Sequence, residues 1–209
     1  AVSTDAPYGG VNAAAVSLTT TDNDTGAPPQ ARQATQSGTA TIASGSTSTT
    51  ATITSVAMTR TFLVFSTTLD DSTPASTQVR GELTSSTTLT FTRSGTTGSV
   101  AIKWSVVEYA TGVTVQRGTT SALTGTANNI TIASVNTSKS FPIISSSQSG
   151  TAFGGSHFLK AKLTSSTNLE VAVAAAGSPV VSWQVVEFTN ASVQSGDVSF
   201  SSTDSSKTA

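Results

Sequence analysis

The 209-residue chain contains no cysteine, one histidine and one methionine, and only 10% of its residues are charged. An average soluble domain has roughly 25% charged residues. The lack of cysteine excludes a disulfide scaffold, a thiolate zinc site and a cysteine nucleophile. A formal net charge of −1 gives no basic excess with which to bind nucleic acid or an anionic membrane. No apolar run approaches the roughly 20 residues of a membrane-spanning helix, so we expect no membrane span.

Serine and threonine are abundant instead: 35 Ser and 40 Thr make up about 36% of the chain. Such a composition is common in disordered or mucin-like chains. The apolar residues, however, gather in short runs of Val, Ile, Leu and Phe that Ser, Thr and Gly separate. Threonine is β-branched and suits the half-exposed face of a strand. The pattern therefore predicts a folded all-β protein.

An internal repeat organises the chain. Residues 83–87 (Leu-Thr-Ser-Ser-Thr) recur unchanged 80 residues later, at 163–167. Residues 104–109 (Trp-Ser-Val-Val-Glu-Tyr) recur with an offset of 79 at 183–188, as Trp-Gln-Val-Val-Glu-Phe. Blocks that keep their order and spacing in this way indicate a tandem duplication of one structural unit.

A Gln-x-Gly element joins the repeats and occurs three times, at residues 36–38, 116–118 and 194–196. The chain therefore has two repeat bodies but three copies of the connecting strand region. One such region is in surplus near the C-terminus, where we expect it to be free to pair with another chain.

The repeat boundaries predict four parts of the chain. We expect an N-terminal arm or linker over 1–35, which is rich in Pro and Gly. The first repeat covers 36–118 and the second 119–200. Residues 201–209 form a C-terminal tail that could act as a donor strand.

Short strands at regular spacing dominate each repeat. Residues 100–106 show the period-2 alternation of a half-buried strand, with Val100, Ile102, Trp104 and Val106 on one face. About seven such strands follow one another in each repeat, between turn signals. We therefore predict two tandem seven-stranded antiparallel β-sandwich domains of the immunoglobulin or jelly-roll type, preceded by an arm.

Three apolar positions recur in both repeats and are the predicted core. An exposed Trp can stack on a sugar, but both Trp residues share a strand face with Val, which favours a core position. The candidate core residues are Trp104, Trp183, Phe62, Phe141, Leu83 and Leu163.

Candidate catalytic groups are few. Glu108 and Glu187 could be read as a carboxylate pair, but acid–base catalysis needs a second group within reach and no other acid recurs. We expect them to accept backbone N–H bonds or to pair with a cation. His157 follows two glycines, and we expect it to be exposed in a loop. Without a nucleophile elbow for a serine triad, the sequence predicts that the protein is not an enzyme and needs no cofactor.

Metal and modification sites are weakly signalled. Asp22 and Asp24 resemble part of a calcium loop, but the position of its bidentate Glu holds Gln33. An Asx-rich turn is the favoured interpretation, with calcium as the alternative. Four Asn-x-Ser/Thr sequons are candidate glycosylation sites in an exported protein: Asn23, Asn129, Asn136 and Asn190.

The block Trp-x-Val-Val-Glu-aromatic, followed by Val-x-Val-Gln-x-Gly, resembles tandem repeat modules of bacterial surface proteins, extracellular fibres and phage structural proteins. The resemblance covers residues 36–200. Its motifs are of the core type, so it brings no active site with it. It implies a building block of a virion or an extracellular fibre.

The predicted edges suggest how such a building block associates. Strand regions 39–56 and 119–135 carry no charged residue, although natural edge strands are usually protected by Lys, Pro or bulges. We therefore expect a structural subunit of a filament, tail or capsid, located outside the cell, on its surface or in a virion. Its partners would be copies of itself and other virion or surface proteins. The alternative is an adhesin, or a receptor- or carbohydrate-binding module, that uses the loops 67–77 and 146–157.

Overall fold

The protein is all-β. The computed structural model describes residues 31–69, 71–199, 201 and 205–206. Within this part of the chain, twelve strands form four three-stranded antiparallel sheets. The elements are β1 (Arg32–Ile42), β2 (Ser48–Thr52), η1 (Met58–Arg60), β3 (Thr61–Leu69), α1 (Pro74–Thr77), β4 (Arg80–Ser85), β5 (Thr88–Thr92), β6 (Val100–Tyr109), β7 (Val113–Thr119), β8 (Ala127–Thr131), η2 (Thr137–Lys139), β9 (Ser140–Ser147), β10 (Leu159–Ser165), β11 (Asn168–Val173) and β12 (Val180–Phe188).

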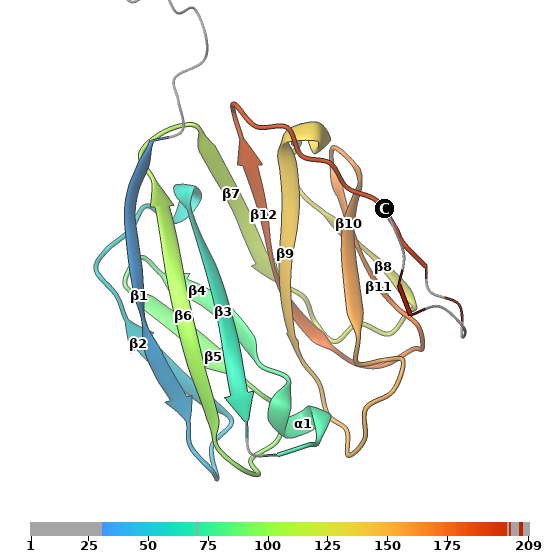
Figure 1. The fold of residues 1–209 in the computed structure, drawn as a ribbon. Coiled ribbons are helices and arrows are strands. Elements are labelled where there is room, and N and C mark those ends of the chain that lie inside the picture. The colour runs from blue at the N-terminus through green and yellow to red at the C-terminus, as the bar shows by residue number, and fades with distance from the viewer. Residues whose placement is uncertain (1–30, 70, 200, 202–204, 207–209) are drawn as a thin grey trace, which may run out of the picture.

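The two halves of the chain have the same strand topology. The first half forms the sheets β1-β6-β3 and β2-β5-β4, and the second forms β7-β12-β9 and β8-β11-β10. The halves lie side by side (Figure 1). Even single hydrogen bonds recur: the Ile53 amide donates to Thr87 O over 2.9 Å, and the Ile132 amide donates to Thr167 O over 3.0 Å. The same local patterns therefore produce the same local structure twice.

The core of the first half lies between its two sheets. Trp104 on β6 is 7% exposed and packs with Leu83, Leu89 and Phe91 from the opposing sheet. Opposite the Trp104 ring lies Gly38, where a Cβ would be only 2.5 Å from ring atom Cζ2. Glycine is therefore the side chain that lets β1 approach the indole ring.

The second half repeats this arrangement with a smaller core. Leu169 and Val185 are buried there, and Trp183 and Leu163 are partly buried against them. A Cβ at Gly118 would lie 2.6 Å from Cζ2 of Trp183. Phe62 and Phe141 are partly buried elsewhere, in a third cluster around Val113, Val115 and Val186.

Strand pairing differs in two places from the boundaries drawn on the sequence. β1 begins at Arg32, so residues 32–35 belong to a strand and not to the arm; their ladder with β6 supplies the backbone hydrogen bonds. β7 was counted with the first repeat, but it pairs with β12. With β7 assigned to its ladder partner, each half has six strands, where the sequence analysis counted about seven.

Side-chain to backbone bonds join the two halves. The buried amide of Gln184 accepts a hydrogen bond from the Leu63 N–H and donates one to the Leu63 carbonyl oxygen, both over 2.9 Å. It thereby occupies the outer edge of β3. Arg117 donates to the carbonyl oxygens of Met58 and Thr61, each over 2.5 Å, and burial lowers the pKa of Arg117 to about 10. The rings of Tyr109 and Phe188 pack edge to face between the two halves, with their centroids 5.7 Å apart.

Arg93 is the largest fully buried side chain, at 2% exposure. Its guanidinium donates to six backbone carbonyl oxygens at 2.8–3.3 Å and has no carboxylate partner among the described residues. These carbonyls belong to the turn after β1, to α1 and to residues 96–98. Arg93 thus holds three loops at one end of the first half, where the second half has Val173 instead.

None of the helices in the described part of the chain is long and apolar enough to cross a membrane.

Candidate interaction site on the second half

The candidate site forms where the C-terminal segment lies along the second half. This segment, residues 190–199, runs past η2, β9 and β10 without joining a sheet (Figure 1). The Val193 amide donates to Ser138 O over 2.7 Å and fixes the beginning of the segment. Farther along the segment, the Asp197 side chain makes ion pairs with β10.

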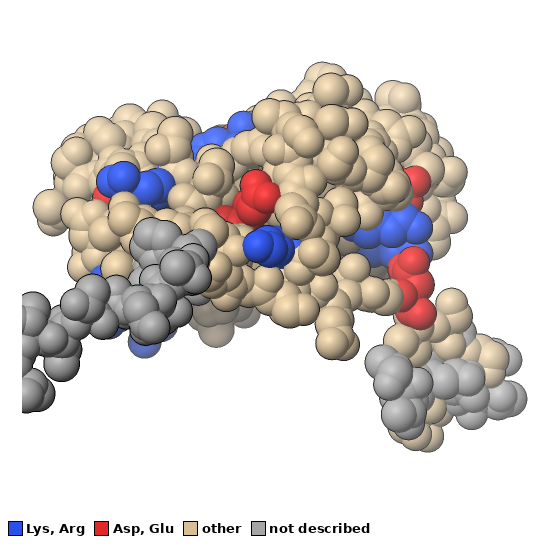
Figure 2. Space-filling model, turned by 90° about the horizontal axis from the view of Figure 1, so that it is seen from above, with Lys and Arg blue, Asp and Glu red and all other residues tan. Residues whose placement is uncertain are grey.

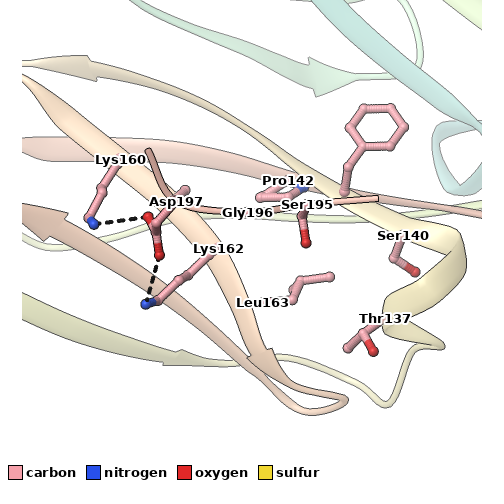
Figure 3. A pocket seen from close by; sticks show the side chains of 11 residues that line it. Thr137, Ser140, Pro142, Lys160, Lys162, Leu163, Ser195, Gly196 and Asp197 are labelled. Atoms are coloured by element: carbon pink, nitrogen blue, oxygen red, sulfur yellow. Dashed lines mark hydrogen bonds and ion pairs between the residues drawn. The ribbon is translucent and has the colours of Figure 1, made fainter. Parts of the chain in front are cut away.

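A groove of about 340 Å³ lies between this segment and the second half. β9 contributes Phe141 and Pro142, β10 contributes residues 160–163, and the segment contributes residues 195–197 (Figure 3). Because strand residues alternate between two faces, β10 turns its lysines and its apolar residues in different directions. The groove therefore has an apolar floor and a charged rim.

Asp197 closes the charged rim. Its carboxylate contacts Lys160 Nζ at 3.1 Å and Lys162 Nζ at 3.6 Å (Figure 3). The hydrogen bond and the charge of Lys160, helped by Lys162, lower the pKa of Asp197 below its ordinary value of 3.8. Lys162 also pairs with Glu170 on β11, at 3.6 Å. The terminal segment is thus held by charge at an exposed position, where solvent weakens the attraction.

The first half has the same groove with a different occupant. There, residues 117–119 of β7 lie against β4 as residues 195–197 lie against β10. Thr119 donates a hydrogen bond to Glu82, where Asp197 pairs with Lys162. Ser182 and Gln184 of β12 also line this first groove, whose volume is only about 120 Å³. The second groove is larger, and its lining includes no strand that corresponds to β12.

The recurring glutamates have structural partners. Glu108 is 6% exposed and accepts a hydrogen bond from the Ala57 amide over 2.7 Å. Glu187 accepts one from the Asn136 amide over 2.8 Å. Each carboxylate therefore fixes the 3-10 turn of its own half, and the structure does not bring the two together as a catalytic pair.

His157 is buried, at 8% exposure, so the expectation of an exposed loop histidine was wrong. Its Nδ1 accepts a hydrogen bond from the Gly154 amide over 3.1 Å, and its ring meets Phe153 edge to face. The carbonyl oxygen of His157 accepts a bond from Gln78. Gly150 lets the loop approach the ring, because a Cβ there would lie 2.7 Å from Nε2 of His157. These contacts give the His157 side chain a structural role.

The metal and glycosylation candidates are not brought into one site. Asp22, Asp24 and Asn23 lie outside the described residues. Among residues that are described, no group of three His, Cys, Asp or Glu side chains could hold a metal ion. The sequon residues Asn129, Asn136 and Asn190 are all exposed.

The two loops that sequence analysis proposed as a contact surface lie side by side. The Ala75 amide donates to Gly150 O over 3.2 Å, and Gln78 bonds His157 as described above. Phe153 and Phe158 stack there with ring centroids 5.6 Å apart, and they are 45% and 67% exposed. The loops therefore form one surface and not two separate ones.

Sequence reasoning missed the charged residues of the groove. A signal existed in the repeat alignment: Glu82 corresponds to Lys162, and Thr119 corresponds to Asp197. Both partners of one contact had changed, from a Thr–Glu bond to an Asp–Lys pair. Paired substitution of this kind indicates two residues in contact, but the contact became visible only with the fold.

Replacing Asp197 by Asn should loosen the terminal segment. A lowered carboxylate pKa means that the attraction to Lys160 is present at neutral pH and is lost as the pH falls through that lowered pKa. We therefore expect faster hydrogen exchange at the Val193 amide in Asp197→Asn, and in the unchanged protein in acid or high salt. Glu170→Gln is the matched control, because it removes a partner of Lys162 that does not belong to the segment. Equal exchange in both variants would argue against this role.

The groove combines an apolar floor, a charged rim and the backbone of residues 194–198, which joins no strand ladder within the described part of the chain. Exposed backbone of this kind suits the docking of a protein strand. No family model, no curated protein and no solved structure matches this chain.

Proposed function

We propose that this protein is a structural subunit of an extracellular or virion assembly, such as a filament, a tail or a capsid-associated layer, and that it self-associates through strand edges or exchanged terminal strands. One observation carries the proposal: the uncharged regions 39–56 and 119–135 contain the edge strands β2 and β8. An unprotected edge presents N–H and C=O groups to any chain that can add a strand.

The edges lack the usual protection against such pairing. β2 and β8 contain neither Lys nor Pro, and on the outer face of β2 Thr50 and Thr52 are exposed. Charged side chains occupy only small areas of the face in Figure 2, and most of that surface is neutral. With a net charge of −1, repulsion between copies is weak.

The repeat architecture supports the same role. We infer that each half is a sandwich-like domain, because its core draws side chains from both of its sheets. The repeat motifs resemble those of bacterial surface, fibre and phage structural proteins, and they are core motifs that bring no active site with them. Glu108, Glu187 and His157 each bond a backbone amide, which favours a protein that is not an enzyme.

Lysine substitution on an edge tests the proposal. The unchanged protein should self-associate as its concentration rises, and Thr50→Lys/Thr52→Lys should reduce this several-fold, because charge on an edge opposes strand addition. Sedimentation and electron microscopy over a wide concentration range measure the effect.

A loop variant controls for the added charge. Ala176 and Ser178 lie in an exposed loop outside the strands, so Ala176→Lys/Ser178→Lys, which adds the same two charges, should associate like the unchanged protein. A protein that stays monomeric at the highest concentration would contradict the proposal.

A second candidate function is an adhesin or a receptor- or carbohydrate-binding module. The exposed, stacked Phe153 and Phe158 favour it, beside an apolar hollow of about 370 Å³ that Leu159 and Val173 line. Aromatic faces of this kind stack on apolar faces of ligands. Phe158→Ser should abolish binding to a glycan array or to cells. Val64→Ser is the control: it replaces an apolar side chain of β3 by the same polar one and should leave binding unchanged.

A further inference from the structure

The C-terminal segment has the side-chain pattern of a paired strand, but it pairs with none in the described chain. Residues 194–196 (Gln-Ser-Gly) are identical to residues 36–38 of β1. In β1 this pattern has three structural roles, which belong to the glutamine, to the glycine and to the apolar residue two positions later; β7 shares the first two.

The glutamine normally binds a neighbouring backbone. Gln36 accepts a hydrogen bond from the Thr54 amide over 2.7 Å and donates to Thr54 O over 2.9 Å. Gln116 makes the same two bonds with Ala133, at 2.8 and 3.0 Å. Within the described residues, Gln194 has no hydrogen-bond partner.

The glycine normally makes room for a Trp ring. A Cβ at Gly38 or Gly118 would lie 2.5 or 2.6 Å from the Trp ring opposite. At Gly196 an added Cβ meets no described atom within 4 Å, and the backbone there does not have the positive φ that favours glycine. In the single chain, therefore, neither a close neighbour nor the backbone conformation requires a glycine at position 196.

The apolar residue normally faces a core. Ala40, two residues after Gly38, packs against the core of the first half. Val198 holds the same place after Gly196 and is 47% exposed. Where the segment now lies in the described chain, Gln194, Gly196 and Val198 make none of the contacts of their counterparts in β1. Beside a strand that carries a Trp, all three could make those contacts.

The segment already lies where such a strand would join it. On the first half, β7 lies in the corresponding groove and pairs with β12, which carries Trp183. On the second half, residues 193–198 occupy this place with no such strand beside them. What is missing is a strand of the type of β6 or β12.

We propose that residues 193–198 of one copy pair with β6 of a second copy, in the register that β1 holds in its own chain. This rests on the proposed self-association and names the strands that perform it. Gly196 then lies opposite Trp104 and Ser195 opposite Ser105, as Gly38 and Ser37 do within one chain. β1 of the second copy is displaced from β6. The first half of the second copy then docks on the open groove of the first copy.

Exchange replaces one antiparallel ladder with another and adds a contact between halves. β1 is the easier strand to release, because the residues on its outer face, such as Thr35 and Thr39, are exposed and polar. The incoming strand has a larger apolar side chain at the matching inward-facing position, with Val198 for Ala40. Burial of Val198 and of the apolar groove floor favours the exchanged form.

Gly196→Val is the direct test, with Gly154→Val as its matched control. Both glycines are exposed, and both would accept a Cβ without contact in the single chain. Only Gly196 meets a Trp ring after exchange. We expect Gly196→Val to raise the concentration needed for association roughly tenfold or more, as overpacking against a rigid ring does, and Gly154→Val to leave it unchanged.

A disulfide lock tests whether β1 must leave. Ser37 and Ser105 lie opposite each other in the ladder, and the chain has no cysteine of its own. In Ser37→Cys/Ser105→Cys, oxidation should tie β1 to β6 and abolish association, and reduction should restore it. Each single cysteine variant, kept reduced, serves as a control for the substitutions.

The outcomes separate this proposal from the broader one. Loss of association in Gly196→Val and in the oxidised lock, with Gly154→Val unaffected, supports strand exchange. If Gly196→Val or the oxidised lock associates as strongly as the unchanged protein, the exchange is overturned while self-association through other edges stands. If the unchanged protein is monomeric throughout, both fail.

Discussion

Replacing Arg93 by Met should lower the free energy of unfolding by about 3 kcal/mol or more, because a buried acceptor that loses its donor costs about 1–3 kcal/mol and several lose it here. The guanidinium donates to six carbonyl oxygens, including those of Ala43, Ser76 and Gly98. Met fills much of the volume but leaves these acceptors without donors in a site closed to water. Thermal and denaturant unfolding measure the loss.

Two further variants make the reason for this loss testable. Arg93→Lys keeps the charge but not the planar fork, so we expect only a partial rescue. Arg32→Met is the control, since Arg32 is exposed and, among the described residues, its side chain bonds Thr35 alone, at 2.8 Å; it should change stability by less than about 0.5 kcal/mol. Equal stability of Arg93→Met and Arg32→Met would show that the carbonyl contacts contribute little.

Gly38→Val should also destabilise the protein, although valine favours strands. The added Cβ would lie 2.5 Å from Cζ2 of Trp104, a ring that is 7% exposed and cannot swing into solvent. Overpacking of this kind costs about 1–3 kcal/mol, which exceeds the gain of up to about 1 kcal/mol from β-propensity. The midpoint of denaturant unfolding should fall accordingly.

A second substitution shows whether the Trp ring is the cause. Trp104→Phe removes the six-membered ring that contacts Gly38, together with a buried indole N–H that has no partner among the described residues. The double variant Gly38→Val/Trp104→Phe should therefore lose less stability than the sum of the two single changes. Strict additivity would mean that the two side chains do not clash.

Much of the fold could be predicted because it depends on local patterns. The alternation over residues 100–106 placed Val100, Ile102 and Trp104 on the buried face of β6, since successive side chains of a strand point to opposite sides. The internal offset of 79–80 residues placed equivalent residues at equivalent positions of two sheets. The three Gln-x-Gly elements pointed to a surplus strand region, and residues 193–198 indeed lie beside the second half without a ladder partner.

The rest depended on partners that are distant in the sequence. Gln184 bonds Leu63 across 121 residues, and nothing near Gln184 in the sequence marks it as the residue that covers the edge of β3. His157 was expected to be exposed in its loop, but the loop folds over the side chain and buries it. Arg93 is a polar position that the repeat does not retain, since Val173 corresponds to it, and its burial follows from three loops that meet only in the folded chain.

The sequence by itself therefore determined the class of structure and the internal repeat with its three Gln-x-Gly elements, because each follows from the periodicity of side chains along one strand or from self-similarity. Only the tertiary structure decided that β7 pairs with β12, that Asp197 pairs with Lys160 and Lys162, and that Gly196 faces no Trp ring in its own chain. The physical reason is that a strand's pattern specifies which face is buried, whereas its partner is chosen by packing and hydrogen bonding between segments far apart in the chain.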